Sequence, residues 1–165
     1  MTRLPLLLAL AASVAFAQVV PEREIQIIQS LYDTGQYAEV VRRVDESFSV
    51  ANFTDAQRVK LLELSAVSAF NTGDLKVAQL SYLALLKLNP DHVLDPFAVP
   101  PPAIRLFEQI KRDNVDALNL IRQQLALRAE QDKRAAEERA RLAREEDERK
   151  RQQALRDGTV TVRTV

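Results

Sequence analysis

The architecture of this 165-residue chain is clearest in residues 69–78, which read Ala69-Phe70-Asn71-Thr72-Gly73-Asp74-Leu75-Lys76-Val77-Ala78. Apolar residues before and after this segment recur every three or four positions, which is typical of amphipathic helices. Gly73 stands just past the last periodic residue of the first helix. Glycine is favoured there because it lacks a Cβ atom and readily adopts the left-handed conformation that closes many helices. The segment therefore predicts two helices joined by a tight turn, a helical hairpin.

A similar hairpin is predicted upstream, around Gly35. The segment Leu31-Tyr32-Asp33-Thr34-Gly35-Gln36-Tyr37-Ala38-Glu39-Val40 again places a glycine between two helical patterns. Gly35 and Gly73 are 38 residues apart, and the helical pattern runs from Val20 to about Asn89, where Pro90 ends it. The chain holds only 3 glycines, which disfavours β folds built from tight hairpins. An all-α fold is therefore predicted.

Two hairpins at this spacing resemble the tetratricopeptide repeat (TPR) family over about residues 21–92. The turn glycines Gly35 and Gly73 match the family pattern, and Pro90 matches its closing proline after the second helix. The first copy departs from the pattern at Glu24, where a bulky apolar residue is usual, and has no closing proline near Asn52. The resemblance implies that residues 18–92 form two TPR-like hairpins, stacked so that their first helices line a concave face.

By the same resemblance, a set of side chains on those first helices faces the concave groove and forms the candidate partner-binding site. They are Ile25, Gln29, Tyr32, Asp33, Lys60, Glu63, Val67, Phe70 and Asn71. The alternative is that Tyr32 and Phe70 belong to the core, as aromatic residues at helical spacing usually do. Some family members clamp a carboxy-terminal carboxylate with Lys and Asn, where this chain has Gln29, Glu63 and Val67. We therefore expect a protein or peptide partner that is recognised in another way.

Residues 93–102 form a proline-rich connector that cannot be a regular helix, because its prolines remove donors and hold the preceding residues extended. We expect Leu94, Phe97 and Val99 to pin this connector to the second hairpin. The final proline, Pro102, is expected in the first turn of the next helix. The alternative is that the prolines form a polyproline ligand for an aromatic groove of another protein.

Helical character is predicted again over residues 103–157, with no glycine or proline until Gly158. The first part, to about Ile110, is expected to cap the second hairpin, and Arg112-Asp113-Asn114 marks a kink or break. Residues 115–129 retain apolar positions that would suit a coiled coil and self-association. These positions are Leu118, Ile121 and Leu125. Beyond Leu125 the same seam continues to Arg128, Asp132, Ala135 and Arg139, which puts charges where apolar residues are needed.

Residues 130–151 contain 8 acidic and 8 basic side chains. Acid-first pairs four residues apart can each stabilise a helix by about 0.2–0.5 kcal/mol. The predicted pairs are Glu130–Arg134, Glu137–Arg141, Glu145–Arg149, Glu146–Lys150 and Asp147–Arg151. A solvated charged helix is therefore favoured over a coiled coil. Nucleic-acid binding is disfavoured, because the interleaved carboxylates repel phosphates.

The two ends of the chain differ from the helical region between them. Residues 1–17 resemble a signal peptide, with Arg3, an apolar run, and Ala15-Phe16-Ala17 as an A-x-A cleavage site. Cleavage after Ala17 predicts a periplasmic or otherwise secreted protein without stable membrane insertion. The alternative, an uncleaved membrane anchor, needs an apolar run of roughly 20 residues. Residues 158–165 alternate like a strand and are expected either to fray or to pair with an outside sheet.

Composition argues against catalysis. Lys and Arg number 23, as do Asp and Glu, so the formal net charge is +0, and cysteine is absent. His92 is the only histidine, and we expect it to be exposed and without a role. The serines lack a nucleophile motif, and no metal-ligand set or cofactor motif is found. The sequence therefore predicts a non-enzymatic adaptor of the bacterial envelope without a cofactor. The alternative is a structural spacer that oligomerises through residues 115–129.

Overall fold

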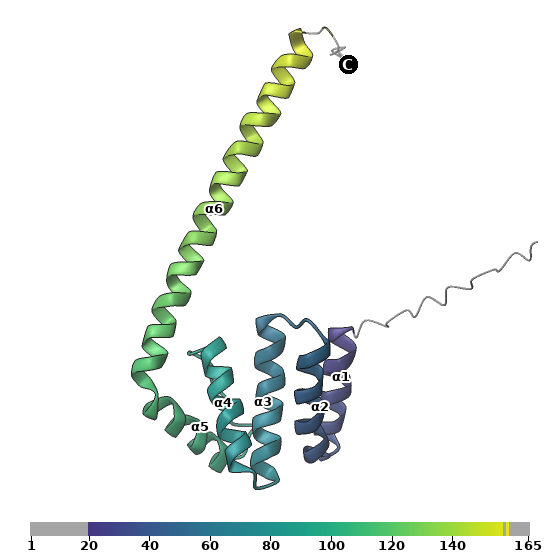
Figure 1. Ribbon diagram of the computed structural model, residues 1–165, viewed down its shortest axis with the longest axis vertical. Coiled ribbons are helices and arrows are strands. Elements are labelled where there is room, and N and C mark those ends of the chain that lie inside the picture. Colours follow the sequence, from purple (N-terminus) through teal and green to yellow (C-terminus); the bar gives the residue numbers. More distant parts are fainter. Residues whose placement is uncertain (1–19, 157, 159–165) are drawn as a thin grey trace, which may run out of the picture. The chain divides into compact units, whose positions relative to one another are not determined.

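The structure is a computed structural model that describes residues 20–156 and residue 158, and the described residues are helical without any strand (Figure 1). This confirms the all-α fold class for the described part of the chain. The helices are α1 (Pro21–Asp33), α2 (Tyr37–Val50), α3 (Asp55–Asn71), α4 (Leu75–Leu88), α5 (Pro101–Asp113) and α6 (Val115–Arg156). The predicted signal peptide, residues 1–17, and the strand-like residues 159–165 lie outside the described residues.

Helices α1 to α4 form two successive hairpins whose turns have the same geometry. Gly35 and Gly73 have φ angles of +73° and +83°. In the first turn, the Gly35 and Gln36 N–H groups donate to carbonyls of the preceding helix at 3.0 and 2.9 Å. In the second, Gly73 and Asp74 donate in the same pattern at 3.1 and 2.9 Å. Both turns are Schellman motifs, in which a left-handed residue lets the last carbonyls of the helix find donors.

Helix α3 is the centre of the hairpin unit and packs against α1, α2 and α4. Its start is fixed by a capping box, in which the Thr54 hydroxyl accepts from the Gln57 N–H while the Gln57 side chain accepts from the Thr54 N–H. The first hairpin contributes buried apolar residues that pack against this helix. They are Ile28, Val40, Val44, Ala51 and Phe53, which cluster with Leu61 and Leu64 of α3.

Glu24, the position that departs from the TPR pattern, is buried between the first two helices. Its exposed fraction is only 6%, and the Arg43 guanidinium of α2 donates to both of its carboxylate oxygens at 2.5 and 3.0 Å. These hydrogen bonds raise the pKa of Arg43. A bidentate ion pair thus joins α1 to α2.

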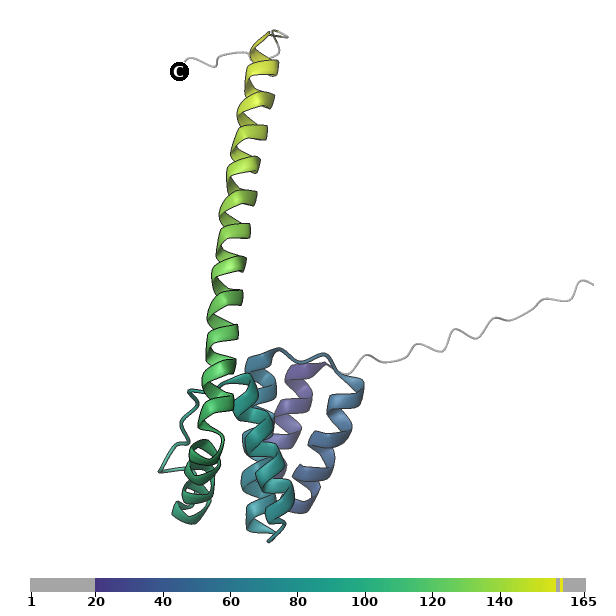
Figure 2. The ribbon, with the colours of Figure 1, turned by 60° about the vertical axis from the view of Figure 1, so that its left-hand side comes forward.

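The connector after α4 packs on the hairpins through two of its three predicted anchors. Leu94 and Val99 are buried, each 4% exposed, whereas Phe97 is 98% exposed, so the prediction that Phe97 pins the connector is wrong. The turn that begins at Asp95 points Phe97 outward between the two buried neighbours. Helix α5 then begins at Pro101 and lies beside α4 (Figure 2). Its Phe107 is fully buried and meets Tyr82 of α4 edge to face, with ring centroids 5.1 Å apart.

Residues 111–165 form a second unit, which contains α6. The break before α6 falls at Asn114, within the predicted cluster. Among the described residues, Glu130–Arg134 and Glu146–Lys150 pair as predicted, at 2.9 and 2.7 Å. Arg141 lies instead 3.8 Å from both Glu138 and Glu145, as expected where exposed partners compete and each pair is weak. No helix in the described part of the chain is long and apolar enough to cross a membrane.

Candidate functional site

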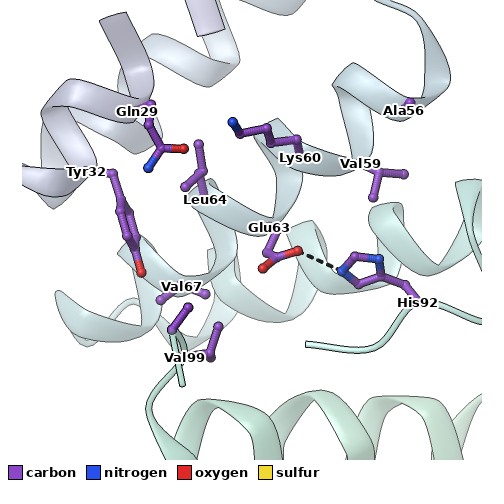
Figure 3. A pocket seen from close by; sticks show the side chains of 11 residues that line it. Gln29, Tyr32, Ala56, Val59, Lys60, Glu63, Leu64, Val67, His92 and Val99 are labelled. Carbon is purple, nitrogen blue, oxygen red and sulfur yellow. Dashed lines mark hydrogen bonds and ion pairs between the residues drawn. The ribbon is translucent and has the colours of Figure 1, made fainter. Parts of the chain in front are cut away.

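A pocket of about 300 Å³ lies between α1, α3 and the connector (Figure 3). Its lining combines an apolar floor with polar side chains contributed by the two first helices of the hairpins. The lining residues are Gln29, Tyr32, Ala56, Val59, Lys60, Glu63, Leu64, Val67, His92, Ala98 and Val99. A small apolar cavity with a few polar groups at its edge is the usual form of a site that binds a side chain or small ligand.

The structure brings together five of the predicted groove residues in this pocket and places the other four elsewhere. Gln29, Tyr32, Lys60, Glu63 and Val67 line it. The remaining four residues do not line the pocket. Ile25 packs against the core of the first hairpin, Asp33 is exposed and accepts a hydrogen bond from Gln29 at 2.9 Å, Phe70 is half-buried, and Asn71 is exposed.

His92 closes one side of the pocket, so the prediction that its side chain is exposed is wrong. Its side chain is 18% exposed, and its Nε2 atom lies 2.7 Å from Oε2 of Glu63 in α3 (Figure 3). Its ring also meets Phe107 of α5 edge to face, with centroids 6.2 Å apart. The connector therefore folds back to α3, so that His92 joins two segments that are 29 positions apart in the sequence.

Sequence reasoning missed the pocket residues that come from the connector, namely His92, Ala98 and Val99. It also missed Ala56, Val59 and Leu64, which lie on α3 among the predicted positions. The α3 residues share a helical face with Lys60 and Glu63, so the three- and four-residue spacing was a usable signal. The connector residues carry no such signal, because their place depends on the path of an irregular segment.

The charges and hydroxyls around the pocket are unevenly solvated. Lys60 is exposed at the mouth, whereas Tyr32 is half-buried and has its ring 5.7 Å from that of Tyr37. Burial raises the pKa of Tyr32, and nearby Tyr37, Glu63 and Asp33 raise it further. The hydroxyl of Tyr82, fully buried on α4, has no hydrogen-bond partner among the described residues. Burial, followed by the charge of Glu63, raises the Tyr82 pKa well above its usual range.

A second groove, of about 490 Å³, crosses α2, α3 and α4 and is more uniformly apolar. Phe48 and Leu80 are its large exposed side chains, 36% and 58% exposed, and Ser65 and Ser81 hydrogen-bond to each other within its lining at 3.3 Å. Arg42 and Asp45 also line this groove, but Arg42 is already paired with Glu39 and Glu46 of its own helix. The pocket beside α1 is the better candidate because Gln29, Lys60 and Tyr32 supply polar groups that can orient a ligand.

The described residues contain no cluster of three His, Cys, Asp or Glu side chains arranged to hold a metal ion. Comparison with protein-family models, curated proteins and solved structures finds no match to this chain.

Proposed function

We propose that this protein is a non-enzymatic adaptor that binds a protein or peptide through a short TPR-like head. The observation that carries the proposal is the pocket of about 300 Å³ built jointly by α1, α3 and the connector. Two hairpins with matching Schellman turns support the repeat assignment, since each hairpin has a left-handed glycine and the same pair of hydrogen bonds in the turn between its two helices. The head recognises its partner, and α6 serves as an arm that spans distance or docks on a larger assembly.

The pocket chemistry favours an extended segment with one apolar side chain as the bound element. Val67 and Val99 are buried and form apolar surface at the base of the pocket, where such a side chain gains from leaving water. Gln29 and Lys60 stand at the edge, where they can meet polar groups of the same segment. We further propose that this binding takes place in the periplasm or outside the cell, because residues 1–17 resemble a signal peptide with cleavage after Ala17.

The proposal is tested by filling the pocket in the full chain. Peptides are selected from a displayed random library on the immobilised protein, and their affinities are measured by calorimetry. We expect Ala56→Trp to weaken binding by roughly tenfold or more, because the indole occupies space that the ligand side chain needs. Ala38→Trp is the matched control, because Ala38 is also an exposed alanine in the first turn of a helix and does not line the pocket. Failure to select any peptide that Ala56→Trp weakens and Ala38→Trp spares would contradict the pocket as the binding site.

A second candidate function, a self-associating spacer, is favoured by one observation on α6. Leu120 and Leu127 lie seven residues apart on one face of the helix and are 56% and 65% exposed. A second copy of the helix could cover them within residues 115–129. The mass of the protein in solution separates this candidate from the adaptor.

A further inference from the structure

Phe97 is the most exposed large apolar side chain among the described residues, with 98% of its surface open to water. An exposed leucine or valine on a helix is common, but a phenylalanine that is 98% exposed leaves nearly all of its ring in water, which is unfavourable for apolar surface. Val93, four residues earlier on the same connector, is 73% exposed. The connector therefore displays two exposed apolar side chains four positions apart, and neither of them lines the pocket.

The backbone beneath Phe97 is well defined by its own hydrogen bonds. The Asp95 carboxylate accepts the Phe97 N–H at 2.9 Å, and the Asp95 carbonyl accepts the Ala98 and Val99 N–H groups at 3.1 and 2.9 Å. Pro96 restricts the backbone between them. Leu94 and Val99, both buried, hold the two sides of the turn on the head. Phe97 is thus presented on a fixed support.

A rigid support matters because binding a partner normally costs conformational freedom in the segment that is bound. An aromatic side chain that is already held in place loses only its own rotations on docking. Aromatic residues that fill a partner pocket are typical of the few positions that dominate interface energies. The exposed ring and the ordered turn together therefore point to recognition.

Charge indicates which kind of partner fits this turn. Asp91 and Asp95 are the only residues of the Lys, Arg, Asp and Glu types between Lys87 and Arg105. The exposed carboxylate of Asp95, beside Phe97 in the turn, makes this apolar side chain complementary to an apolar pocket with a basic rim and is repelled by an anionic membrane surface. We propose that the turn Asp95–Val99 is a docking element that inserts Phe97 into an apolar pocket, rimmed by basic side chains, on a partner protein.

The side chain that docks, Phe97, does not line the pocket proposed to bind a peptide, although Ala98 and Val99 of the same turn do. The two surfaces can therefore be altered separately, and either can fail a test without the other.

The test begins with a photocrosslinking benzophenone side chain at position 97 of the full chain, expressed in the cells that naturally make it. The protein that is crosslinked there is purified, and its affinity for the unmodified chain is measured by calorimetry. We expect Phe97→Ala to weaken that affinity by roughly tenfold or more, since the anchor is lost. Val50→Ala is the matched control, because Val50 is also a large apolar residue of the head, 66% exposed, at the end of α2.

The charge in the proposal is tested with Asp95→Asn. The asparagine oxygen still accepts the Phe97 N–H, so the turn is kept while its negative charge is removed. We expect a weaker affinity and a smaller loss of affinity between low and high salt than for the unmodified chain. The urea midpoints of Phe97→Ala and Asp95→Asn are expected to equal that of the unmodified chain, which shows that folding is unchanged.

Three results would overturn the docking element. They are the lack of a discrete protein adduct at position 97, a purified partner that binds Phe97→Ala as tightly as the unmodified chain, and Phe97-dependent binding to phosphatidylcholine vesicles. The last result would assign the turn to a lipid surface instead. None of the three would alter the effect of Ala56→Trp on peptide binding, so the pocket proposal is tested independently.

Discussion

At the scale of single residues, Tyr82 and Glu24 are two of the buried polar side chains, and they differ in whether the buried polar group has a partner. Glu24 has a bidentate partner in Arg43, whereas the Tyr82 hydroxyl is buried without a hydrogen-bond partner among the described residues. A buried hydroxyl without a partner lowers stability, because it has lost its hydrogen bonds to water. The Tyr82 ring offsets this loss through its edge-to-face contact with Phe107, which joins α4 to α5.

We therefore expect Tyr82→Phe to raise the free energy of unfolding by about 1 kcal/mol at neutral pH, because the ring stays and the unsatisfied hydroxyl goes. The measurement is urea unfolding followed by circular dichroism. Tyr37→Phe, at the start of α2, is the control and should change stability by less than about 0.5 kcal/mol. A loss of stability in Tyr82→Phe would mean that the hydroxyl has a stabilising partner.

The same residue predicts how stability falls in alkali. Burial raises the pKa of folded Tyr82 above the unfolded value of 10.0, so between these two values the unfolded chain has lost a proton that the folded chain keeps. This contribution to stability is complete below pH 10 and is lost as the pH rises from there towards the folded pKa. Urea midpoints measured from pH 8 to pH 11 should fall less steeply for Tyr82→Phe than for the unmodified chain. Equal slopes would contradict the raised pKa.

The ion pair of Glu24 and Arg43 predicts an asymmetric response to its two deletions. The Glu24 side chain is 8% exposed and that of Arg43 is 35% exposed. Arg43→Ala leaves a buried carboxylate without its partner, and we expect it to cost about 2 kcal/mol of unfolding free energy. Glu24→Leu leaves an arginine that can reach water and should cost less than half as much. Urea unfolding at pH 7 distinguishes this order from equal or reversed costs.

At the scale of elements, the two hairpins depend on turns that demand a left-handed residue. A Cβ atom added at Gly35 or Gly73 would meet nothing within 4 Å, so the demand comes from the backbone conformation and not from crowding. The helices on either side are fixed by different devices, such as the capping box before α3 and the Asp74 cap on the Val77 N–H of α4. Turn and caps together set where each helix begins and ends.

We expect Gly73→Ala to lower the unfolding free energy by about 1–2 kcal/mol, the cost of placing an alanine in the left-handed region. Gly73→Asn should cost less, because asparagine tolerates this region better than alanine does. Thermal or urea unfolding of both variants provides the measurement. If alanine and asparagine cost the same, the strain at this turn is not conformational.

At the scale of the whole molecule, the chain divides into the hairpin unit, residues 1–110, and the unit of residues 111–165. The first has a buried apolar core, whereas Leu118 is the one buried residue among those described in α6. Helix α6 therefore depends on local interactions, such as Glu130–Arg134, far more than on packing. In the proposed function, the first unit carries the recognition surfaces and the second supplies length.

Light scattering on the full chain over a wide concentration range tests whether α6 also self-associates. We expect a monomer mass at every concentration, because the next two positions at the seven-residue spacing of Leu120 and Leu127 are the charged Arg134 and Arg141. A mass that rises with concentration, and that Leu120→Glu with Leu127→Glu returns to the monomer value, would favour the spacer. Leu142→Glu is the matched control, because Leu142 is 51% exposed on the same helix but has no leucine seven residues away.

The helices and their breaks follow from the printed sequence, because they rest on interactions between residues a few positions apart. The period of apolar residues, the glycines at 35 and 73 and the polar break at Asn114 are all local signals. The same signals placed Gln29, Tyr32, Lys60, Glu63 and Val67 on the first helices of the hairpins. Local spacing in the sequence therefore predicts where the helices lie and which helix face each side chain occupies.

The completed pocket and the display of Phe97 depend on the path of residues 89–100, which have no period to read. Phe97 was predicted to pack on the hairpins because it is apolar. The turn at Asp95 instead points Phe97 outward, while Leu94 and Val99 are buried. Solvent exposure was expected for His92, but the connector brings it to Glu63, 29 positions earlier. Contacts across such distances are set by how an irregular segment lies on packed helices, and that packing is a property of the folded chain as a whole.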